Sequence, residues 1–242
     1  MKTLVIPDIH NKVDAVDPII DKHNPDRVVL LGDYFDSFEE RPETEEKIAE
    51  HTALWVKEMD HRGYNIFWGN HEMSYIFPYL YRCSGFTVEK YDIINSIITC
   101  DIWNRFKLVM EIDGIWLSHA GMHNSIFSHP HKGFTPEDVE AICNAALENA
   151  RLRVPHPALE AGATRGGRAP VGGITWLDWQ NMMPFWDKEG NPIRQLVGHT
   201  PGKNVRTRGG TPEEFHCACM DTHLTYVATI VDGHVEFHKV IS

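Results

Sequence analysis

Short apolar runs separated by polar segments open the chain. Residues 2–7 and 28–31 each form such a run, and the stretch 13–22 between them is mostly polar with helical character. Runs of this length are typical of buried strands, and the order strand, helix, strand predicts an α/β sheet. The segments 65–72 (NIFWGNHE) and 114–121 (GIWLSHAG) predict a third and a fourth strand, each leading into a polar loop.

Longer-range patterns predict two helices, a hairpin and one long loop. Apolar residues recur at helical spacing in 44–62, and Gly63 is placed to end that helix. The segment 135–151 opens with Thr-Pro, which favours a helix start. An Asp-Gly pair inside 225–241 predicts a β-hairpin. Residues 154–173 are rich in Gly, Pro and Arg, and we expect a loop with a functional role.

The composition limits the class of protein. The chain has 242 residues, and no apolar stretch approaches the roughly 20 residues needed to span a membrane. No Pro/Gly/Ser linker or repeat divides it, so we expect a single domain, 1–242. The formal charge of −11 argues against generic nucleic-acid binding. It does not exclude a phosphorylated substrate, because bound cations can reverse the local field.

The cysteines favour a reducing compartment. Their number, five, is odd and their spacing is not that of a zinc site, which favours free thiols over a disulfide framework. Cys217 and Cys219 lie two apart in a strand-like segment and are interpreted as buried structural thiols. Because the N-terminal residues also lack a leader pattern, we expect a cytoplasmic location.

One pattern repeats where predicted strands end. A small residue or proline is followed at once by Asp, Asn or His in IPDIH (6–10), LLGDYFD (30–36), WGNHE (68–72), LSHAG (117–121) and VGHTP (197–201). Loops at the carboxyl ends of strands converge in open α/β sheets, so we expect these side chains to meet. Oxygen and nitrogen ligands brought to one place predict a metal site.

In this order the motifs resemble those of the calcineurin-like metallophosphoesterase superfamily, in the branch of the serine/threonine protein phosphatases and related bacterial and phage enzymes. The matching motifs are DIH (8–10), GDYFD (32–36), GNHE (69–72), SHAG (118–121) and GHT (198–200), with weaker agreement in WLDW (176–179) and MDTH (220–223). The resemblance implies an α/β fold of two packed mixed β-sheets flanked by helices, a four-layer α-β-β-α sandwich.

The resemblance also implies two divalent metal ions. Carboxylates combined with imidazoles suit Mn²⁺, which we expect first, with Fe, Zn or Ni as alternatives, rather than Ca²⁺. Asp33 would bridge the two ions. Two ions sharing a water lower its pKa and supply a hydroxide that attacks phosphorus. The ligands implied by position are Asp8, His10, Asp33, Asn70, His119 and His199.

His71 follows a predicted ligand and has a different expected role. In the family the matching histidine protonates the leaving-group oxygen, and the acid matching Asp36 orients it. A carboxylate on one ring nitrogen supports the cationic form that a general acid needs. Glu72 is interpreted as a residue that ties down the loop.

The resemblance breaks at Ser37. The protein-phosphatase pattern has an arginine there, whose fork of donors clamps the substrate phosphate. Arg165 and Arg168 are the nearest candidate replacements, and the alternative is two solvated loop arginines.

The expected function is metal-dependent hydrolysis of a phosphate ester, first as a phosphomonoesterase acting on a protein or small molecule. Ser37 leaves open a phosphodiesterase or dinucleoside polyphosphate hydrolase, and an inactive binding or scaffold protein is the alternative from another class. Trp176 and Trp179 are interpreted as core packing rather than pocket walls. His123 is interpreted as a surface residue or pocket rim, and His223, near the terminal strands, is interpreted as part of a solvated face.

Overall fold

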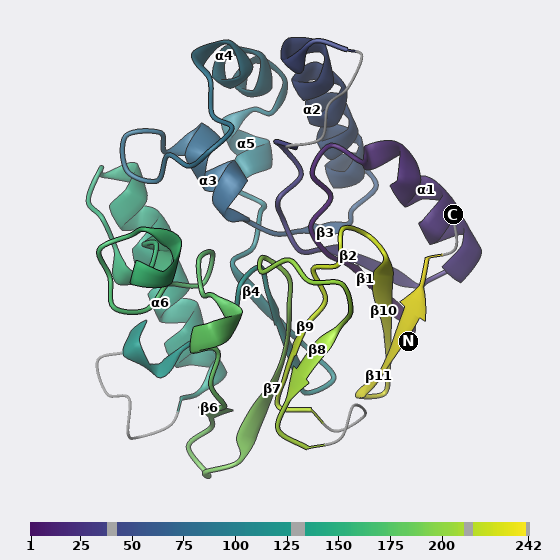
Figure 1. Cartoon of the computed structure of the whole chain (residues 1–242), viewed down its shortest axis with the longest axis vertical. Helices are drawn as coiled ribbons and strands as arrows, with labels where there is room; N and C mark the ends of the chain where they lie inside the picture. Colours follow the sequence, from purple (N-terminus) through teal and green to yellow (C-terminus); the bar gives the residue numbers. More distant parts are fainter. Residues whose placement is uncertain (38–42, 127–133, 211–214, 241–242) are drawn as a thin grey trace.

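Two stacked β-sheets form the centre of the computed structural model, which describes residues 1–37, 43–126, 134–210 and 215–240 (Figure 1). Within these ranges the first sheet has the order β11-β10-β1-β2-β3, and the second has the order β4-β5-β7-β9-β8 with β6 paired to β7. Both sheets mix parallel and antiparallel pairs. The described strands are β1 (Thr3–Ile6), β2 (Arg27–Leu30), β3 (Asn65–Ile66), β4 (Val109–Ile112), β5 (Ile115–Ser118), β6 (Phe185–Trp186), β7 (Pro192–Val197), β8 (Arg206–Arg208), β9 (Cys217–Cys219), β10 (Tyr226–Val231) and β11 (His234–Lys239).

Helices flank the sheets, as Figure 1 shows with α1 and α2 beside the β1–β2–β3 side and α6 on the side of β6. Their bounds are α1 (Val16–His23), α2 (Glu45–His61), α3 (Asn70–Ile76), α4 (Val88–Ile97), α5 (Cys100–Trp103) and α6 (Pro136–Arg151). The four-layer α-β-β-α arrangement expected from the resemblance is therefore confirmed. No helix in the described ranges combines the length and apolarity needed to cross a membrane.

Strand β1 is covered on both faces, which explains its unbroken apolar sequence. It pairs in parallel with β2 and antiparallel with β10. Leu4 and Ile6 belong to the cluster that contains the helix residues, whereas Val5 packs with residues of the second sheet such as Leu117 and Leu196. Since successive side chains of a strand point to opposite faces, one apolar strand supplies two layers of the core.

The two long predicted helices are confirmed at their ends. The Thr44 side chain accepts a hydrogen bond from the backbone N–H of Lys47 at 3.4 Å, and α2 ends where Gly63 adopts a left-handed φ of 75°. The Thr135 side chain caps α6 by accepting from the backbone N–H of Asp138 at 3.2 Å. The hairpin is also present, with Val231 paired to His234 across the Asp-Gly turn.

The segment after β3 differs from the expected loop. Helix α3 begins at Asn70, directly after Gly69, so GNHE is the first turn of a helix. Strand β3 itself is only two residues long. The structure also contains α4 and α5, which the apolar pattern of these segments does not predict. Residues 154–173 are loop apart from short 3-10 turns at Pro157–Leu159 and Ala163–Arg165.

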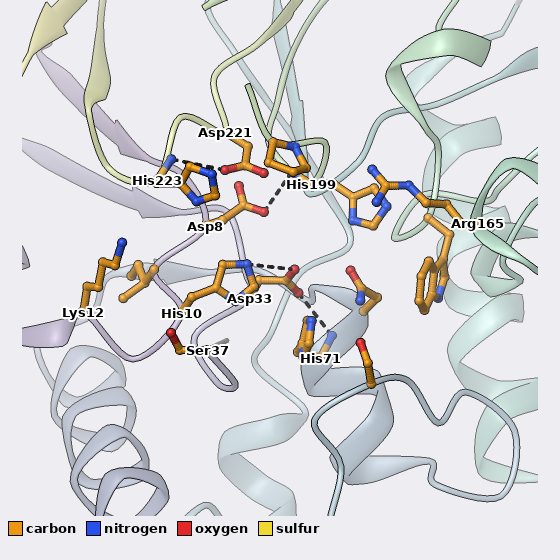
Figure 2. A pocket seen from close by; sticks show the side chains of 15 residues that line it. Asp8, His10, Lys12, Asp33, Ser37, His71, Arg165, His199, Asp221 and His223 are labelled. Atoms are coloured by element: carbon orange, nitrogen blue, oxygen red, sulfur yellow. Dashed lines mark hydrogen bonds and ion pairs between the residues drawn. The ribbon is translucent and has the colours of Figure 1, made fainter. Parts of the chain in front are cut away.

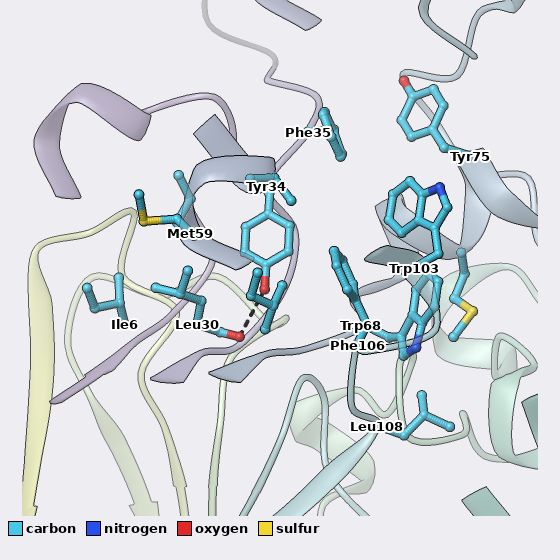
Figure 3. Close-up of a cluster of buried hydrophobic side chains, with 14 of the residues drawn as sticks. Ile6, Leu30, Tyr34, Phe35, Met59, Trp68, Tyr75, Trp103, Phe106 and Leu108 are labelled. Atoms are coloured by element: carbon cyan, nitrogen blue, oxygen red, sulfur yellow. Dashed lines mark hydrogen bonds between the residues drawn. The ribbon is translucent and has the colours of Figure 1, made fainter. Parts of the chain in front are cut away.

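An aromatic cluster lies behind the loops that follow β2 and β3 (Figure 3). Trp68 and Trp103 stack with ring centroids 5.3 Å apart and an interplanar angle of 14°. The buried Tyr34 hydroxyl donates to the backbone oxygen of Leu30 at 3.0 Å and accepts from the backbone N–H of Phe67 at 3.0 Å. Through these two bonds the Tyr34 side chain holds the end of β2 against the residue that follows β3. Tyr34 comes directly after Asp33, so the same bonds also fix the backbone beside Asp33. The apolar core therefore fixes the backbone on which the polar loops are mounted.

Candidate metal centre

Four of the five predicted loops line one cavity of about 260 Å³ (Figure 2). These four follow β1, β2, β3 and β7, and the fifth follows β5 and carries His119. His119 does not line the cavity and is fully buried behind it. The other predicted ligands line the cavity, and they are Asp8, His10, Asp33, Asn70 and His199.

Among the described residues, two groups of three side chains have geometry that could hold a metal ion. One group is His10, Asp33 and His71, and the other is Asp33, His119 and His199. The ligand atoms within each group all lie within 4.8 Å of one another. Asp33 Oδ2 lies 3.8 Å from His10 Nε2 and 3.4 Å from His119 Nε2. Asp33 is thus the residue shared by two adjacent candidate cation sites.

Backbone carbonyls orient two of the imidazoles toward Asp33. His10 Nδ1 lies 2.8 Å from the backbone oxygen of Asp36, and His119 Nδ1 lies 2.9 Å from that of Leu31. Since a carbonyl only accepts, each Nδ1 donates, and Nε2 is the ring nitrogen that could bind a cation after losing its proton. His119 Nε2 also lies 3.1 Å from Asn70 Oδ1.

Asp8 and His199 present buried polar atoms toward the same place. Asp8 Oδ1 accepts from the backbone N–H of His199 at 2.8 Å. Asp8 Oδ2 and His199 Nε2 are buried and have no hydrogen-bond partner among the residues that the structure describes. Asp8 belongs to neither group of three. Buried acceptors without partners are unfavourable, and a divalent cation is the kind of group that this donor set fits.

Two glycines in the motifs permit close backbone approach to the carboxylates. A Cβ atom at Gly69 would lie 2.2 Å from Asp33 Oδ1, and one at Gly198 would lie 2.0 Å from Asp8 Oδ2. Any larger residue would displace the carboxylate. This requirement accounts for the glycine that precedes Asn70 and the one that precedes His199.

The backbone at the site is held in an uncommon conformation. His10, Asp33, Asp36 and His199 have positive φ angles of 46°, 52°, 64° and 67°. Non-glycine residues adopt this left-handed region at a cost, and the surrounding structure has to maintain it. The backbone oxygen of Asp33 accepts from the N–H of His10 at 2.8 Å, which fastens the β1 loop to the β2 loop.

Glu72 is the main tie between the loops after β2 and β3, as expected from the sequence. Its Oε2 accepts from the backbone N–H groups of Asp33 at 2.7 Å and Gly69 at 2.9 Å. Its Oε1 accepts from the N–H of Tyr34 at 2.8 Å. Burial and the nearby Asp33 charge raise the pKa of Glu72 to about 7. The side chain therefore connects three backbone donors beneath the candidate ligands.

His71 forms a buried ion pair with Asp36. His71 Nδ1 lies 2.7 Å from Asp36 Oδ2, and the two side chains are 7% and 2% exposed. Burial alone would lower the pKa of His71, but the Asp33 charge and the Asp36 hydrogen bond raise it well above its usual value. The contact with Asp36 favours the cationic form of His71, which lines the cavity, so in the group with His10 and Asp33 this histidine is less suited than its neighbours to bind a metal ion.

The remaining charges at the site are strongly interdependent. Burial and the Asp221 charge raise the pKa of Asp8 well above its usual value. Burial would also raise the pKa of Asp33, but His119 and His71 hold it well below the usual value. Burial would lower the pKa of His119, but the charge and hydrogen bond of Asp33, together with the charges of Asp8 and Glu72, raise it to about 9. Asp33 is thus the anionic centre around which the imidazoles gather.

The structure places the two candidate arginines differently. Arg165 lines the cavity, with Nε 2.7 Å from Asp178 Oδ2 and Nη2 donating to Thr200 Oγ1 at 3.0 Å. Arg168 is exposed and lies at a neighbouring cavity instead. Ser37 lines the main cavity at the position where the phosphatase pattern has arginine.

Several residues of the cavity wall were missed or assigned elsewhere by sequence reasoning. Trp176 lines the cavity, with its ring edge-to-face to His199 at 5.6 Å, so core packing is the wrong interpretation for this residue. His223 and Asp221 also line it (Figure 2), and the MDTH motif was the signal that could have placed them there. Lys12 lies on the opposite side from Arg165.

The fold and the polar loops together define an α/β protein with two adjacent candidate cation sites. The sequence profile of the calcineurin-like phosphoesterase family matches residues 1–235, and the chain belongs to this family. Members use divalent metal ions. The two groups of possible ligands agree with this property.

Solved structures show the same fold at low sequence identity. A single-residue variant of a cold-active protein tyrosine phosphatase has a TM-score of 0.60 and 15% identity, over 98% of this chain and 77% of that one. The cold-active protein tyrosine phosphatase of a psychrophilic Shewanella has a TM-score of 0.55 and 14% identity, over 98% and 80%. A protein serine/threonine phosphatase from Saccharomyces cerevisiae has a TM-score of 0.51 and 13% identity, over 100% and 81%. Among curated proteins, no sequence matches this chain.

Proposed function

We propose that this chain is a metal-dependent phosphomonoesterase that acts on a phosphorylated protein or small molecule. The observation that carries the proposal is the shared Asp33 carboxylate, which belongs to both candidate cation groups, beside a buried Asp36–His71 pair on the same cavity. Membership of the phosphoesterase family supports the reaction class.

The proposed ligands supply carboxylate, amide and imidazole donors in a set that suits Mn²⁺, with Fe, Zn or Ni as alternatives. Asp33 would bridge two ions. When bound, two such cations lower the pKa of water and offset charge on the phosphoryl oxygens. The residues proposed to hold them are Asp8, His10, Asp33, Asn70, His119 and His199.

His71 is proposed as the general acid. Its Nδ1 is occupied by Asp36, so the proton on Nε2 is the one available to a substrate. That proton passes to the leaving-group oxygen as the bond from phosphorus to this oxygen breaks, while water supplies the oxygen that phosphorus gains. Arg165 lines the cavity and is proposed to bind the substrate phosphate.

The cysteines and the sequence support proposals on cellular location, domain organisation and reaction class. All five cysteines are free, which is typical of a reducing compartment, and we propose a cytoplasmic location. We also propose that residues 1–242 act as one domain. Ser37 at the cavity keeps a phosphodiesterase or a dinucleoside polyphosphate hydrolase as the second candidate, because the arginine that would clamp a monoester is missing there.

The primary test is Asp33→Asn, assayed with p-nitrophenyl phosphate and Mn²⁺. We expect loss of bound metal by elemental analysis and a fall in turnover of more than about 100-fold. A panel of monoester, cyclic nucleotide and diadenosine polyphosphate separates the reaction classes. Retained turnover in the Asn variant would contradict the proposal. A wild-type protein with neither metal nor turnover would indicate a binding protein instead.

A further inference from the structure

Lys90 is a buried cation that sequence reasoning did not single out. It lies in the first turn of α4, and its side chain is only 6% exposed. Its Nζ donates to Asp36 Oδ1 at 2.8 Å and to Glu45 Oε2 at 3.1 Å. Lysine is rarely buried unless it is paired, so this position has been built around the carboxylate that it contacts.

Asp36 uses its two oxygens for different partners. Oδ2 pairs with His71 Nδ1 at 2.7 Å. Oδ1 accepts from the Tyr75 hydroxyl at 2.6 Å and from Lys90 at 2.8 Å. A Cβ atom at Gly85 would lie 2.6 Å from Asp36 Cγ, so the chain also closes on the carboxyl group from this direction. Rotation of the carboxylate would break the contacts on both oxygens at once.

The charges in this cluster alternate along a path through three helices and the loop after β2. Glu45 begins α2, Lys90 belongs to α4, Asp36 follows β2, and His71 belongs to α3. A buried carboxylate is stable when it is paired and hydrogen-bonded, and here donors reach both of its oxygens. Lys90 itself does not line the cavity around the candidate ligands, so it acts on this site through Asp36.

We propose that Lys90, together with Tyr75, is a positioning residue that fixes the Asp36 carboxylate so that His71 presents its free ring nitrogen to the leaving-group oxygen. The inference rests on the proposed phosphoesterase function and on His71 as its acid. With Lys90 removed, Oδ1 keeps only the Tyr75 hydroxyl. Asp36 can then turn, and the imidazole loses its fixed orientation. Proton donation from His71 to the leaving group then slows, whereas the proposed metal ligands and the binding of the substrate phosphate are unchanged.

The distinguishing property is the dependence on the leaving group. Phenolate is a poor leaving group and needs a proton as it departs, whereas 2,4-dinitrophenolate departs readily as an anion. A defect in proton donation therefore slows phenyl phosphate selectively. A loss of folded protein or of bound metal slows both substrates equally. The ratio of the two kcat values thus separates positioning from a merely structural role.

The experiment compares Lys90→Met and Tyr75→Phe with the wild type and with Lys57→Met, an exposed lysine of α2 that serves as a matched control. For Lys90→Met we expect kcat on phenyl phosphate to fall about 10- to 100-fold, since general acids contribute about 10²- to 10⁴-fold. On 2,4-dinitrophenyl phosphate we expect less than about a threefold change, with metal content unchanged. Tyr75→Phe should show the same selectivity with a smaller loss, and Lys57→Met neither effect.

Equal losses on both substrates with metal retained, or no loss on either, would overturn the inference. If Lys90→Met does not fold, Tyr75→Phe decides by the same ratio, because it removes only the hydroxyl that reaches Oδ1. Failure of the proposed function looks different, since the wild-type protein would then hydrolyse neither ester. Failure of His71 as the acid is also separable, because His71→Ala would then slow both esters equally.

Discussion

Removing the Glu72 carboxylate should destabilise the protein far more than its single position suggests. Glu72→Ala leaves three backbone N–H groups, those of Asp33, Tyr34 and Gly69, without their acceptor. Hydrogen bonds to a charged group contribute about 1.5 kcal/mol each at the lower end, which gives a loss of about 4–5 kcal/mol in the free energy of unfolding. For a chain of this size, that corresponds to a fall in Tm of about 10–15 °C.

The measurement is thermal and urea unfolding at about pH 8, where Glu72, with a pKa of about 7, is ionised. Glu50→Ala, on the exposed face of α2, is the matched control and should change stability by less than about 0.5 kcal/mol. The loss of stability for Glu72→Gln should lie between those of Glu72→Ala and the control. The amide oxygen can replace Oε2 as an acceptor, but the amide nitrogen is a donor and cannot accept from the Tyr34 N–H. A loss below about 1 kcal/mol for Glu72→Ala would refute the reasoning from these three bonds.

Two further outcomes follow from contacts at and beside the site. Gly198→Ala places a methyl group 2.0 Å from Asp8 Oδ2 and should displace this carboxylate. We expect bound metal, measured by elemental analysis, to fall and turnover to fall by about 100-fold. Unchanged metal content and turnover would contradict the close approach. His156 accepts from the Ala158 N–H at 3.2 Å through Nδ1, and burial lowers its pKa below 6.5. The unfolded chain then binds the proton more tightly, so this stabilisation is complete above about pH 6.5 and is lost as the pH falls through the folded-state pKa. His156→Asn keeps an acceptor that does not titrate, and its Tm should drop less than that of the wild type between about pH 7.5 and about pH 5.5, whereas parallel curves would contradict the assignment.

The sequence predicted the strands near the site because short apolar runs between polar loops leave few alternatives. Strands β1 and β2 lie within one residue of the expected ranges, and the loops after them carry Asp8 and Asp33 to one cavity. The sequence did not predict that GNHE starts a helix. That outcome depends on Glu72 accepting the backbone N–H of Gly69 and of a residue from another loop, which is a tertiary contact.

The contacts around Asp36 show most clearly what local patterns cannot provide. Lys90 is 54 residues away along the chain, and α4 around it has weak apolar periodicity. Nothing in the sequence near Lys90 distinguishes it from a solvated lysine. His223 is likewise expected on a solvated face, whereas the structure has it in the segment between β9 and β10, and the pairing of β10 with β1 brings that segment to the cavity. Contacts such as that between Lys90 and Asp36 depend on how whole helices and strands are placed, and residue spacing within one segment does not predict them.

The bond between Asp8 and His199 joins residues 191 positions apart. During synthesis, β1, which Asp8 follows, leaves the ribosome long before its antiparallel neighbour β10, which begins at Tyr226. Until then β1 can pair only with β2, and its other edge stays open to wrong partners. Contacts of such long sequence separation form slowly. We therefore expect the contact between Asp8 and His199 to form late in folding, so that metal binding at the proposed centre would report on the folded protein rather than on its intermediates.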